Sequence, residues 1–319
     1  VLVISGLGQT IYFDKKNINE KELKQKEISN NINEYLDAKK YNLIGIRDLF
    51  YEDGYIYISL QHKDINGYTI NIFRSELNFN RLEFKPFFIT NEYWETYNVF
   101  SGGRIESFDK NRILFSIGFA KNYQAPQDKK SFLGKIISID KLTKDFKIES
   151  YGHRNPQGLF YLKNKKIIIN TEHGPFGGDE VNLNFIEDQT KDKNYGWPIS
   201  STGKPYPNET EIFEKNDWLI KSHKENGFLE PLKSYSPAIG ISEVVSLEEN
   251  NIENLYVSSL RAGSIYILKM SKDFKKITNE ERLFFKEQRI RDLKYDIEQD
   301  LFLAIFSYTP SIAVIKKIN

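Results

Sequence analysis

A two-strand pattern repeats along this chain, and its spacing constrains the fold more than any other feature of the sequence. Each copy is built from an apolar strand, a polar turn and a second, strongly apolar strand. The first copy is represented only by its second strand, Leu2–Ile4. The other copies, with both strands, lie at Ile46–Ser59, Arg104–Ile117, Gln157–Asn170, Ser242–Ser258 and Ile290–Phe306. The second strands are about 54, 58, 53, 88 and 47 residues apart, close to the period of a propeller blade of four short strands. The spacing predicts an all-β chain folded as a six-bladed β-propeller.

One interval is longer than the others. It contains residues 176–232, which are rich in Gly, Pro, Asn and charged side chains. We interpret this segment as a long loop on the binding face, because loops carry function in such folds. Ile18–Leu36 has a helix-like pattern and is interpreted as an insertion between strands of the first blade. No linker is recognisable, so residues 1–319 are expected to form a single propeller domain.

The N-terminus raises a question about ring closure. A blade normally starts with an inner strand, yet Val1–Ile4 has the pattern of a second strand. Either an N-terminal inner strand is missing from this chain, or the ring closes in an unusual way. The chain begins without Met, so a signal peptide would already have been removed and cannot be recognised.

Composition excludes several classes of protein. Lys and Arg number 45 against 44 Asp and Glu, and the net charge of +1 gives no basic excess for nucleic acid. The absence of Cys excludes disulfides and thiolate metal sites. No apolar run approaches the roughly 18 residues of a membrane span. Aromatic residues make up 14% of the chain, and together with Ile they favour strands over helices.

Four short motifs rich in Gly, Pro, His and Asn lie close together in the middle of the chain. They are Gly152–Leu159 (GHRNPQGL), Glu172–Pro175 (EHGP), Gly177–Glu180 (GGDE) and Asn194–Pro198 (NYGWP). Gly lets the backbone approach a ligand and Pro fixes the chain, so these motifs indicate a tight polar site. At these residues the sequence resembles the soluble sugar dehydrogenases that use pyrroloquinoline quinone (PQQ), the glucose/sorbosone dehydrogenase family.

The resemblance implies a set of cofactor-binding residues. PQQ carries three carboxylates, and the planar guanidinium of Arg suits a carboxylate. The implied residues are Arg154, Asn155, Arg261, Arg289 and Arg291. Arg261 stands where the family has Lys, which keeps the charge but changes the contact. Arg289 and Arg291 can converge, since residues two apart on a strand share a face. Taken alone, Arg154 could be a surface ion pair, and the Arg289–Arg291 pair an exposed strand edge.

The resemblance also implies two calcium sites. In the family, the main-chain carbonyls at the positions of Gly174 and Pro175 hold the calcium that sits against the quinone, and hard cations prefer such oxygen ligands. A second, structural calcium is implied at the carboxylate of Glu180 and the carbonyl of Tyr195. His173 matches a subgroup with Glu-His-Gly-Pro, and it is either a hydrogen-bonded structural residue or a catalytic one.

One position departs from the family's chemistry. The segment Phe100–Arg104 matches a family segment in which a His at the position of Phe100 is the general base that takes the sugar hydroxyl proton. Phenylalanine cannot accept a proton, and a positioned base contributes about 10²–10⁴-fold to the rate. No catalytic residue is therefore certain. Glu243 is a speculative replacement base, and the other interpretation is a solvated loop carboxylate.

Two functions remain open. The first is a PQQ- and calcium-dependent sugar dehydrogenase-like propeller that oxidises an aldose or related alcohol and is impaired by Phe100. The second is a degenerate, non-catalytic propeller that binds a carbohydrate, a metal or a protein partner. A calcium-dependent hydrolase has less support, because no set of acidic ligands converges. The resemblance implies a small-molecule sugar or alcohol as partner and a periplasmic or secreted location.

Overall fold

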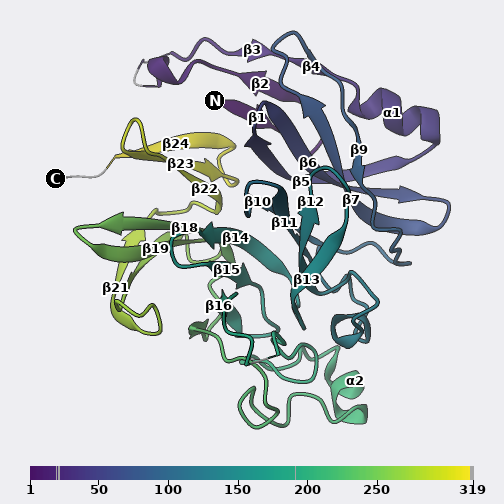
Figure 1. Ribbon diagram of the computed structural model, residues 1–319, viewed down its shortest axis with the longest axis vertical. Coiled ribbons are helices and arrows are strands. Elements are labelled where there is room, and N and C mark those ends of the chain that lie inside the picture. The colour runs from purple at the N-terminus through teal and green to yellow at the C-terminus, as the bar shows by residue number, and fades with distance from the viewer. Residues whose placement is uncertain (19, 21, 191, 317–319) are drawn as a thin grey trace.

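The computed structural model describes residues 1–18, 20, 22–190 and 192–316. Its strands form six antiparallel sheets around a common axis, and the predicted six-bladed β-propeller is confirmed (Figure 1). The first strands of the second to sixth sheets lie beside one another at the axis, and later strands lie progressively further out.

The sheets follow one another along the chain. The first contains β1 (Leu2–Ile4), β2 (Thr10–Tyr12) and β3 (Lys26–Glu27), and the second contains β5 (Asn42–Glu52), β6 (Tyr55–Asp64), β7 (Gly67–Glu76) and β9 (Lys85–Phe88). The third contains β10 (Gly102–Ser107), β11 (Arg112–Ile117), β12 (Lys135–Asp140) and β13 (Phe146–Tyr151). The fourth contains β14 (Pro156–Leu162), β15 (Ile167–Glu172), β16 (Asp179–Phe185) and β17 (Lys233–Tyr235).

The fifth sheet contains β18 (Ile241–Glu249), β19 (Ile252–Ser259), β20 (Ser264–Met270) and β21 (Ile277–Phe284), and the sixth contains β22 (Ile290–Asp296), β23 (Leu301–Phe306) and β24 (Ser311–Lys316). Outside these sheets, β4 (Ser29–Asn30) pairs in parallel with β8 (Arg81–Leu82). The α-helices are α1 (Ile32–Lys39) and α2 (Thr210–Lys215), and short 3-10 turns lie at Lys15–Asn17 and Ala125–Gln127.

The core lies between neighbouring sheets. β15 is buried along its whole length, because sheets pack on both of its faces. Between the second and third sheets, Tyr57 and Ile72 pack in one apolar cluster with Ile113 and Phe115. The second strand of each repeat is therefore almost uninterruptedly apolar, which is the feature that made the repeat visible in the sequence.

The sheets at the two ends of the chain close the ring. Phe13 from the first sheet's connection packs with Leu301 of the sixth sheet in a cluster that also includes Val1. Lys15 adds an ion pair to Asp296 at 3.4 Å. Both sheets have three strands, and Figure 1 shows the N-terminus beside β23 and β24. The missing inner strand stays a prediction.

The helix predicted over Ile18–Leu36 is wrong for most of that range, of which residues 19 and 21 lie outside the described residues. β3 and β4 occupy its middle, and α1 starts only at Ile32, whose amide donates to the side-chain oxygen of Asn30 (3.1 Å). The pairing of β4 with β8 overrides the local helix propensity.

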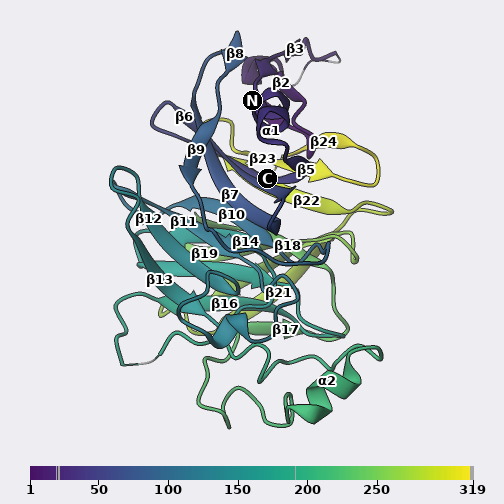
Figure 2. The same cartoon turned by 90° about the vertical axis from the view of Figure 1, so that its right-hand side faces the viewer.

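Residues 186–232 form a long insertion between the third and fourth strands of the fourth sheet, whereas residues 179–185 of the predicted loop form β16. Figures 1 and 2 show the insertion and α2 at one end of the molecule, beyond β16. Trp197, Phe213 and Trp218 of the insertion pack against Phe119 and Tyr123, which follow β11. The insertion thereby covers the loops of the third sheet.

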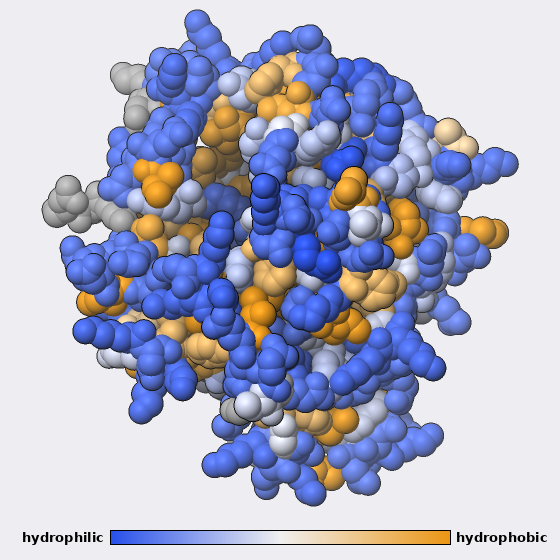
Figure 3. Space-filling model, in the orientation of Figure 1, coloured by the Kyte–Doolittle hydropathy of each residue, from blue (hydrophilic) through white to orange (hydrophobic). Residues whose placement is uncertain are grey.

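The surface shown in Figure 3 is mostly hydrophilic, with apolar side chains in small separate patches. Among the described residues, no helix combines the length and the apolar character that a membrane span requires.

Candidate functional site

Arg154 is the most unusual charged residue of the predicted site. It lies between β13 and β14 and is 2% exposed. Its Nη1 donates to the carbonyl of His173 (3.0 Å), whereas within the described residues Nε and Nη2 have no hydrogen-bond partner. Burial lowers the pKa of Arg154. A buried cation with two unpaired donors is costly, so the arrangement favours an additional acceptor or anion at this place.

Aromatic rings surround this guanidinium. The distances from its Cζ to the ring centres are 4.8 Å for Phe100, 5.1 Å for Trp197, 5.5 Å for Phe119 and 5.9 Å for Tyr206. Two of the four rings, those of Trp197 and Tyr206, come from the insertion. The long segment between β16 and β17 thus supplies part of the wall of the Arg154 site.

Phe100 lies directly beside Arg154 and precedes β10. Its ring is half-buried, 5.5 Å from the ring of Phe119, and the ammonium of Lys121 is 5.7 Å from its centre. The amide of Ala120 donates to the Phe100 carbonyl (2.9 Å). The ring therefore occupies the wall of the site and offers no group that can accept a proton.

A set of amide side chains forms a polar floor next to Phe100. Asn155 is buried, and its side-chain oxygen accepts from the amide of Gly102 (3.2 Å) and from Nε2 of Gln157 (3.1 Å). Gln61 is also buried, and its Oε1 accepts from Ser101 Oγ (3.2 Å). These contacts connect β6 of the second sheet with the starts of the inner strands of the third and fourth sheets.

Three arginines, Arg47 of β5, Arg104 of β10 and Arg289, lie within electrostatic reach of Arg291 at the start of the sixth sheet. Arg291 is exposed at the start of β22, and burial of its charge together with Arg104, Arg289 and Arg47 lowers its pKa. Arg47 donates from Nε to Oε1 of Gln61 (2.9 Å), so it belongs to the same polar floor. Such a gathering of cations favours a negatively charged ligand.

Of the other predicted cofactor-binding residues, Arg289 immediately precedes β22 and Arg261 lies in the turn after β19; both are exposed. The amide of Arg261 donates to the carbonyl of Ile239 (2.9 Å). Arg289 thus lies within electrostatic reach of Arg291, and Arg154 and Asn155 lie together in the connection between β13 and β14.

Gly174 and Pro175 follow β15 in a tight turn. A Cβ atom at Gly174 would lie 1.7 Å from the Gly178 carbonyl oxygen, so only Gly fits there. Gly178 N donates to the Pro175 carbonyl (3.3 Å), and no hydrogen bond within the described residues reaches the Gly174 carbonyl. This oxygen could accept a hard cation, and calcium at Gly174 and Pro175 stays a prediction.

His173 is paired with a buried carboxylate. Its Nδ1 is 3.5 Å from Oδ1 of Asp179, and its side chain is 22% exposed. Burial of Asp179 favours the neutral acid, but His173 and the amides of Ile241 and Gly240 outweigh it and lower its pKa. The pairing fixes the backbone just before Gly174.

Glu180 and Tyr195, the predicted structural calcium ligands, lie in one buried cluster with Glu172. The pKa of Glu180 is raised to about 8 by burial and by Glu172. Glu180 Oε1 accepts from Thr202 Oγ1 (2.8 Å), and the Tyr195 carbonyl accepts from Nε2 of His223 (3.0 Å). Both oxygens thus have protein donors, and in the described part of the chain no three His, Asp or Glu side chains gather as metal ligands. Calcium here stays a prediction.

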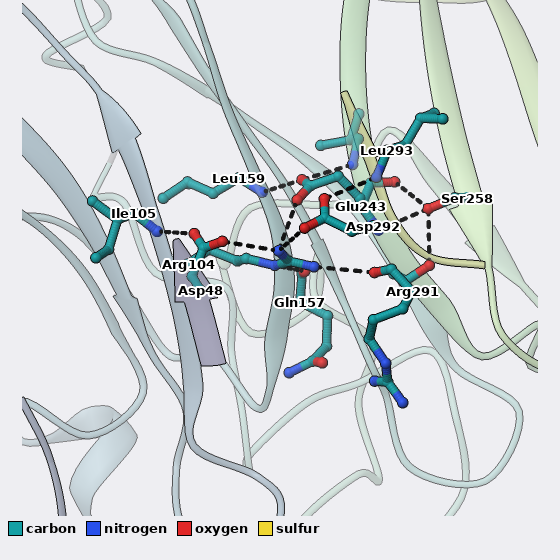
Figure 4. A network of polar contacts seen from close by, with 12 residues as sticks. Asp48, Arg104, Ile105, Gln157, Leu159, Glu243, Ser258, Arg291, Asp292 and Leu293 are labelled. Carbon is teal, nitrogen blue, oxygen red and sulfur yellow. Dashed lines mark hydrogen bonds and ion pairs between the residues drawn. The ribbon is translucent and has the colours of Figure 1, made fainter. Parts of the chain in front are cut away.

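Glu243 does not lie in a solvated loop, and that interpretation is wrong. It belongs to β18, is 1% exposed, and lies at the propeller axis in the network of Figure 4. Its Oε2 is 3.1 Å from Nη1 of Arg104, and its Oε1 accepts from the amides of Leu159 (3.2 Å) and Val244 (3.0 Å). These partners occupy the carboxyl group that was considered as a replacement base.

Several residues of the site were missed in the sequence. Trp197 and Tyr206 contact the predicted Arg154 from the insertion, and Arg47 bonds to Gln61, which in turn accepts from Ser101. Trp197 lies within a motif that was recognised, but there only the carbonyl of Tyr195 was given a role. For the others, no local pattern separates them from ordinary strand and loop residues.

The sequence pattern described as glucose/sorbosone dehydrogenase matches residues 43–307, which is most of the chain. The chain belongs to this family. A curated relative, the aldose sugar dehydrogenase YliI of Escherichia coli, is 28% identical over 213 residues, which is 60% of this chain and 53% of that protein. The chain thus matches about half of this family member's length.

Solved structures of this family have the same fold. A glucose dehydrogenase superposes with a TM-score of 0.78 at 20% identity, covering 100% of this chain and 92% of that one. The PQQ-bound aldose sugar dehydrogenase of Streptomyces coelicolor has a TM-score of 0.67 at 16% identity, with 99% and 93% covered. At these identities the likeness establishes the propeller fold alone.

Proposed function

We propose that this family member is a PQQ- and calcium-dependent sugar dehydrogenase-like protein whose proton-transfer step is impaired by Phe100. The observation that carries the proposal is Arg154, a buried guanidinium with two unpaired donors inside an aromatic wall. A flat, polyanionic quinone has the shape and charge that this site favours. A separate group of arginines, Arg47, Arg289 and Arg291, would supply further positive charge to the ligand.

Each residue has a defined task in this proposal. Arg154, held by the His173 carbonyl, donates its free Nε and Nη2 to a carboxylate. The Gly174 and Pro175 carbonyls hold calcium. When bound, the quinone supplies the hydride acceptor for an aldose or related alcohol. Phe119 and Trp197 exclude water from the charged groups, which strengthens their interactions.

Phe100 limits this chemistry. Removal of the substrate's hydroxyl proton requires an acceptor, and the ring 4.8 Å from Arg154 provides none. The rate is then expected to be lower by about 10²–10⁴-fold than with a positioned base. The same observation favours the second candidate, a non-catalytic propeller that has kept the ligand site and binds a carbohydrate, a metal or a protein partner.

A cofactor-retention experiment tests the proposal. The purified chain is incubated with PQQ and calcium, desalted, and examined for quinone absorbance and then for aldose oxidation. Retained absorbance is expected for the natural chain and for Arg81→Met, whose Arg is a surface ion-pair residue, but not for Arg154→Met. Loss of absorbance from the natural chain contradicts PQQ binding, and retention with no turnover identifies the non-catalytic alternative. A periplasmic or secreted location is part of the proposal and is tested by cell fractionation.

A further inference from the structure

The inner strands share a local irregularity. Register shifts occur at the start of β10, β14, β18 and β22, and β5 has a shift between Ile46 and Asp48. The residues inside these shifts include Arg47, Arg104, Gln157, Glu243 and Arg291. A bulge inserts an extra residue and changes the direction of a side chain. Five blades therefore each present a re-aimed polar residue near the axis.

Arg104 connects these strands. Its Nη1 is 3.2 Å from Asp48, 3.1 Å from Glu243 and 3.2 Å from Asp292, which belong to the second, fifth and sixth sheets. Arg104 itself belongs to the third sheet and is 7% exposed. Asp48 also accepts from the amide of Ile105 (2.8 Å). One guanidinium thus joins four sheets through carboxylates.

Two further bonds of Arg104 reach main-chain carbonyls. Nε donates to the carbonyl of Gln157 (2.6 Å), and Nη2 donates to that of Arg291 (3.1 Å). Both acceptors are bulge residues, in the fourth and sixth sheets. Figure 4 shows the side chains of Gln157 and Arg291 leaving the network on the same side, away from the carboxylates. On that side Gln157 bonds to Asn155, and Arg291 lies within the electrostatic reach of Arg289 and Arg47.

The arrangement separates two roles of charge. Carboxylates compensate Arg104, whereas the side chain of Arg291 leaves the network on the other side, where burial together with Arg104, Arg289 and Arg47 lowers its pKa. A hydrogen bond to its carbonyl holds the backbone without reducing the side chain's charge. The planar fork of Arg can bind both carbonyls and carboxylates at once, which Lys cannot do.

We propose that Arg104 is a positioning residue for the ligand site, which holds the bulges at Gln157 and Arg291 and thereby directs these two side chains toward the bound anion. The inference rests on the proposed function, because that function identifies the anion as PQQ. Arg104→Lys is the informative variant, since it keeps a positive charge among the carboxylates while losing the fork. Arg112→Lys is the matched control: Arg112 also donates to a main-chain carbonyl, that of Ser138, but inside the third sheet.

Two measurements test the positioning role. Hydrogen exchange should accelerate about 10- to 100-fold at the amides of residues 157–159 and 290–293 in Arg104→Lys, because a charge-assisted bond is lost, and should not change there in Arg112→Lys. The dissociation constant for PQQ should rise by a similar factor in Arg104→Lys only. Glu243→Gln, which leaves both carbonyl bonds in place, should bind PQQ like the natural chain.

The results separate this inference from the proposed function. Unchanged exchange in Arg104→Lys, or an equal loss of PQQ affinity in Arg112→Lys, overturns the positioning role. If neither the natural chain nor any variant binds PQQ, the proposed function is wrong. The hydrogen-exchange rates alone then decide whether Arg104 holds the two bulges.

Discussion

Replacement of two buried arginines by methionine should change the free energy of unfolding in opposite directions. In Arg154→Met, the protein loses one bond to a carbonyl and the contacts of the cation with four rings, which the methionine side chain replaces in part. It also loses two unpaired buried donors that cost about 1–3 kcal/mol each, together with the desolvation of the cation. Methionine packs well against aromatic rings. We expect the free energy of unfolding without ligand to increase by about 1–3 kcal/mol.

Arg104→Met should do the reverse. Nη1 of Arg104 compensates three carboxylates at 3.1–3.2 Å. Its removal leaves these carboxylates without the cation that contacts all three. Removing one partner of a buried ion pair typically costs about 3–5 kcal/mol. The expected loss is smaller at pH 5 than at pH 7, because the carboxylates can then take up protons.

Urea unfolding and thermal melts of the natural chain and both variants measure this difference. Saturating PQQ, at 100 times its dissociation constant, should add about 2.7 kcal/mol to the natural chain and nothing to Arg154→Met. A loss of 2 kcal/mol or more in ligand-free Arg154→Met would refute the reasoning, because it would mean that the guanidinium is satisfied by the fold itself.

Three further outcomes are expected. Phe100→His should raise aldose oxidation by about 10²–10⁴-fold if PQQ is retained, and a natural chain that turns over rapidly at a rate unaffected by Phe100→Ala would contradict the role of this position. Burial, with Asp292 and Asp48 nearby, raises the pKa of Glu243 to about 7, so its contribution to stability should be complete below about pH 4.5 and disappear as pH rises through 7; melts from pH 5 to 8 should show a shallower decline in Glu243→Gln. Calcium should raise the melting temperature and a chelator should lower it, and both shifts should be smaller in Glu180→Gln, which keeps the Gly174 and Pro175 carbonyls; melts that do not respond to chelator would exclude the structural calcium.

The propeller could be predicted because its determinants are local. A blade needs buried strands of limited length separated by polar turns, and these requirements leave the same mark in each repeat, such as Arg104–Ile117 and Gln157–Asn170. The Gly and Pro residues around Gly174 were informative for a similar reason. Gly178 lies so close to Gly174 that no side chain fits at Gly174, and both residues belong to the same short segment.

The sequence by itself thus determined the architecture and indicated a region for the candidate site, but not the contacts at the axis. Asp48, Arg104, Glu243 and Asp292 come from four blades, and only closure of the ring brings them together. Burial of Glu243 depends on that closure, and a Glu in a Ser- and Gly-rich segment has no local sign of it. The unpaired donors of Arg154 could not be predicted from the sequence either. The aromatic wall that excludes water from them includes residues of the distant insertion. Local patterns specify strands and turns, whereas desolvation and charge pairing depend on which strands become neighbours.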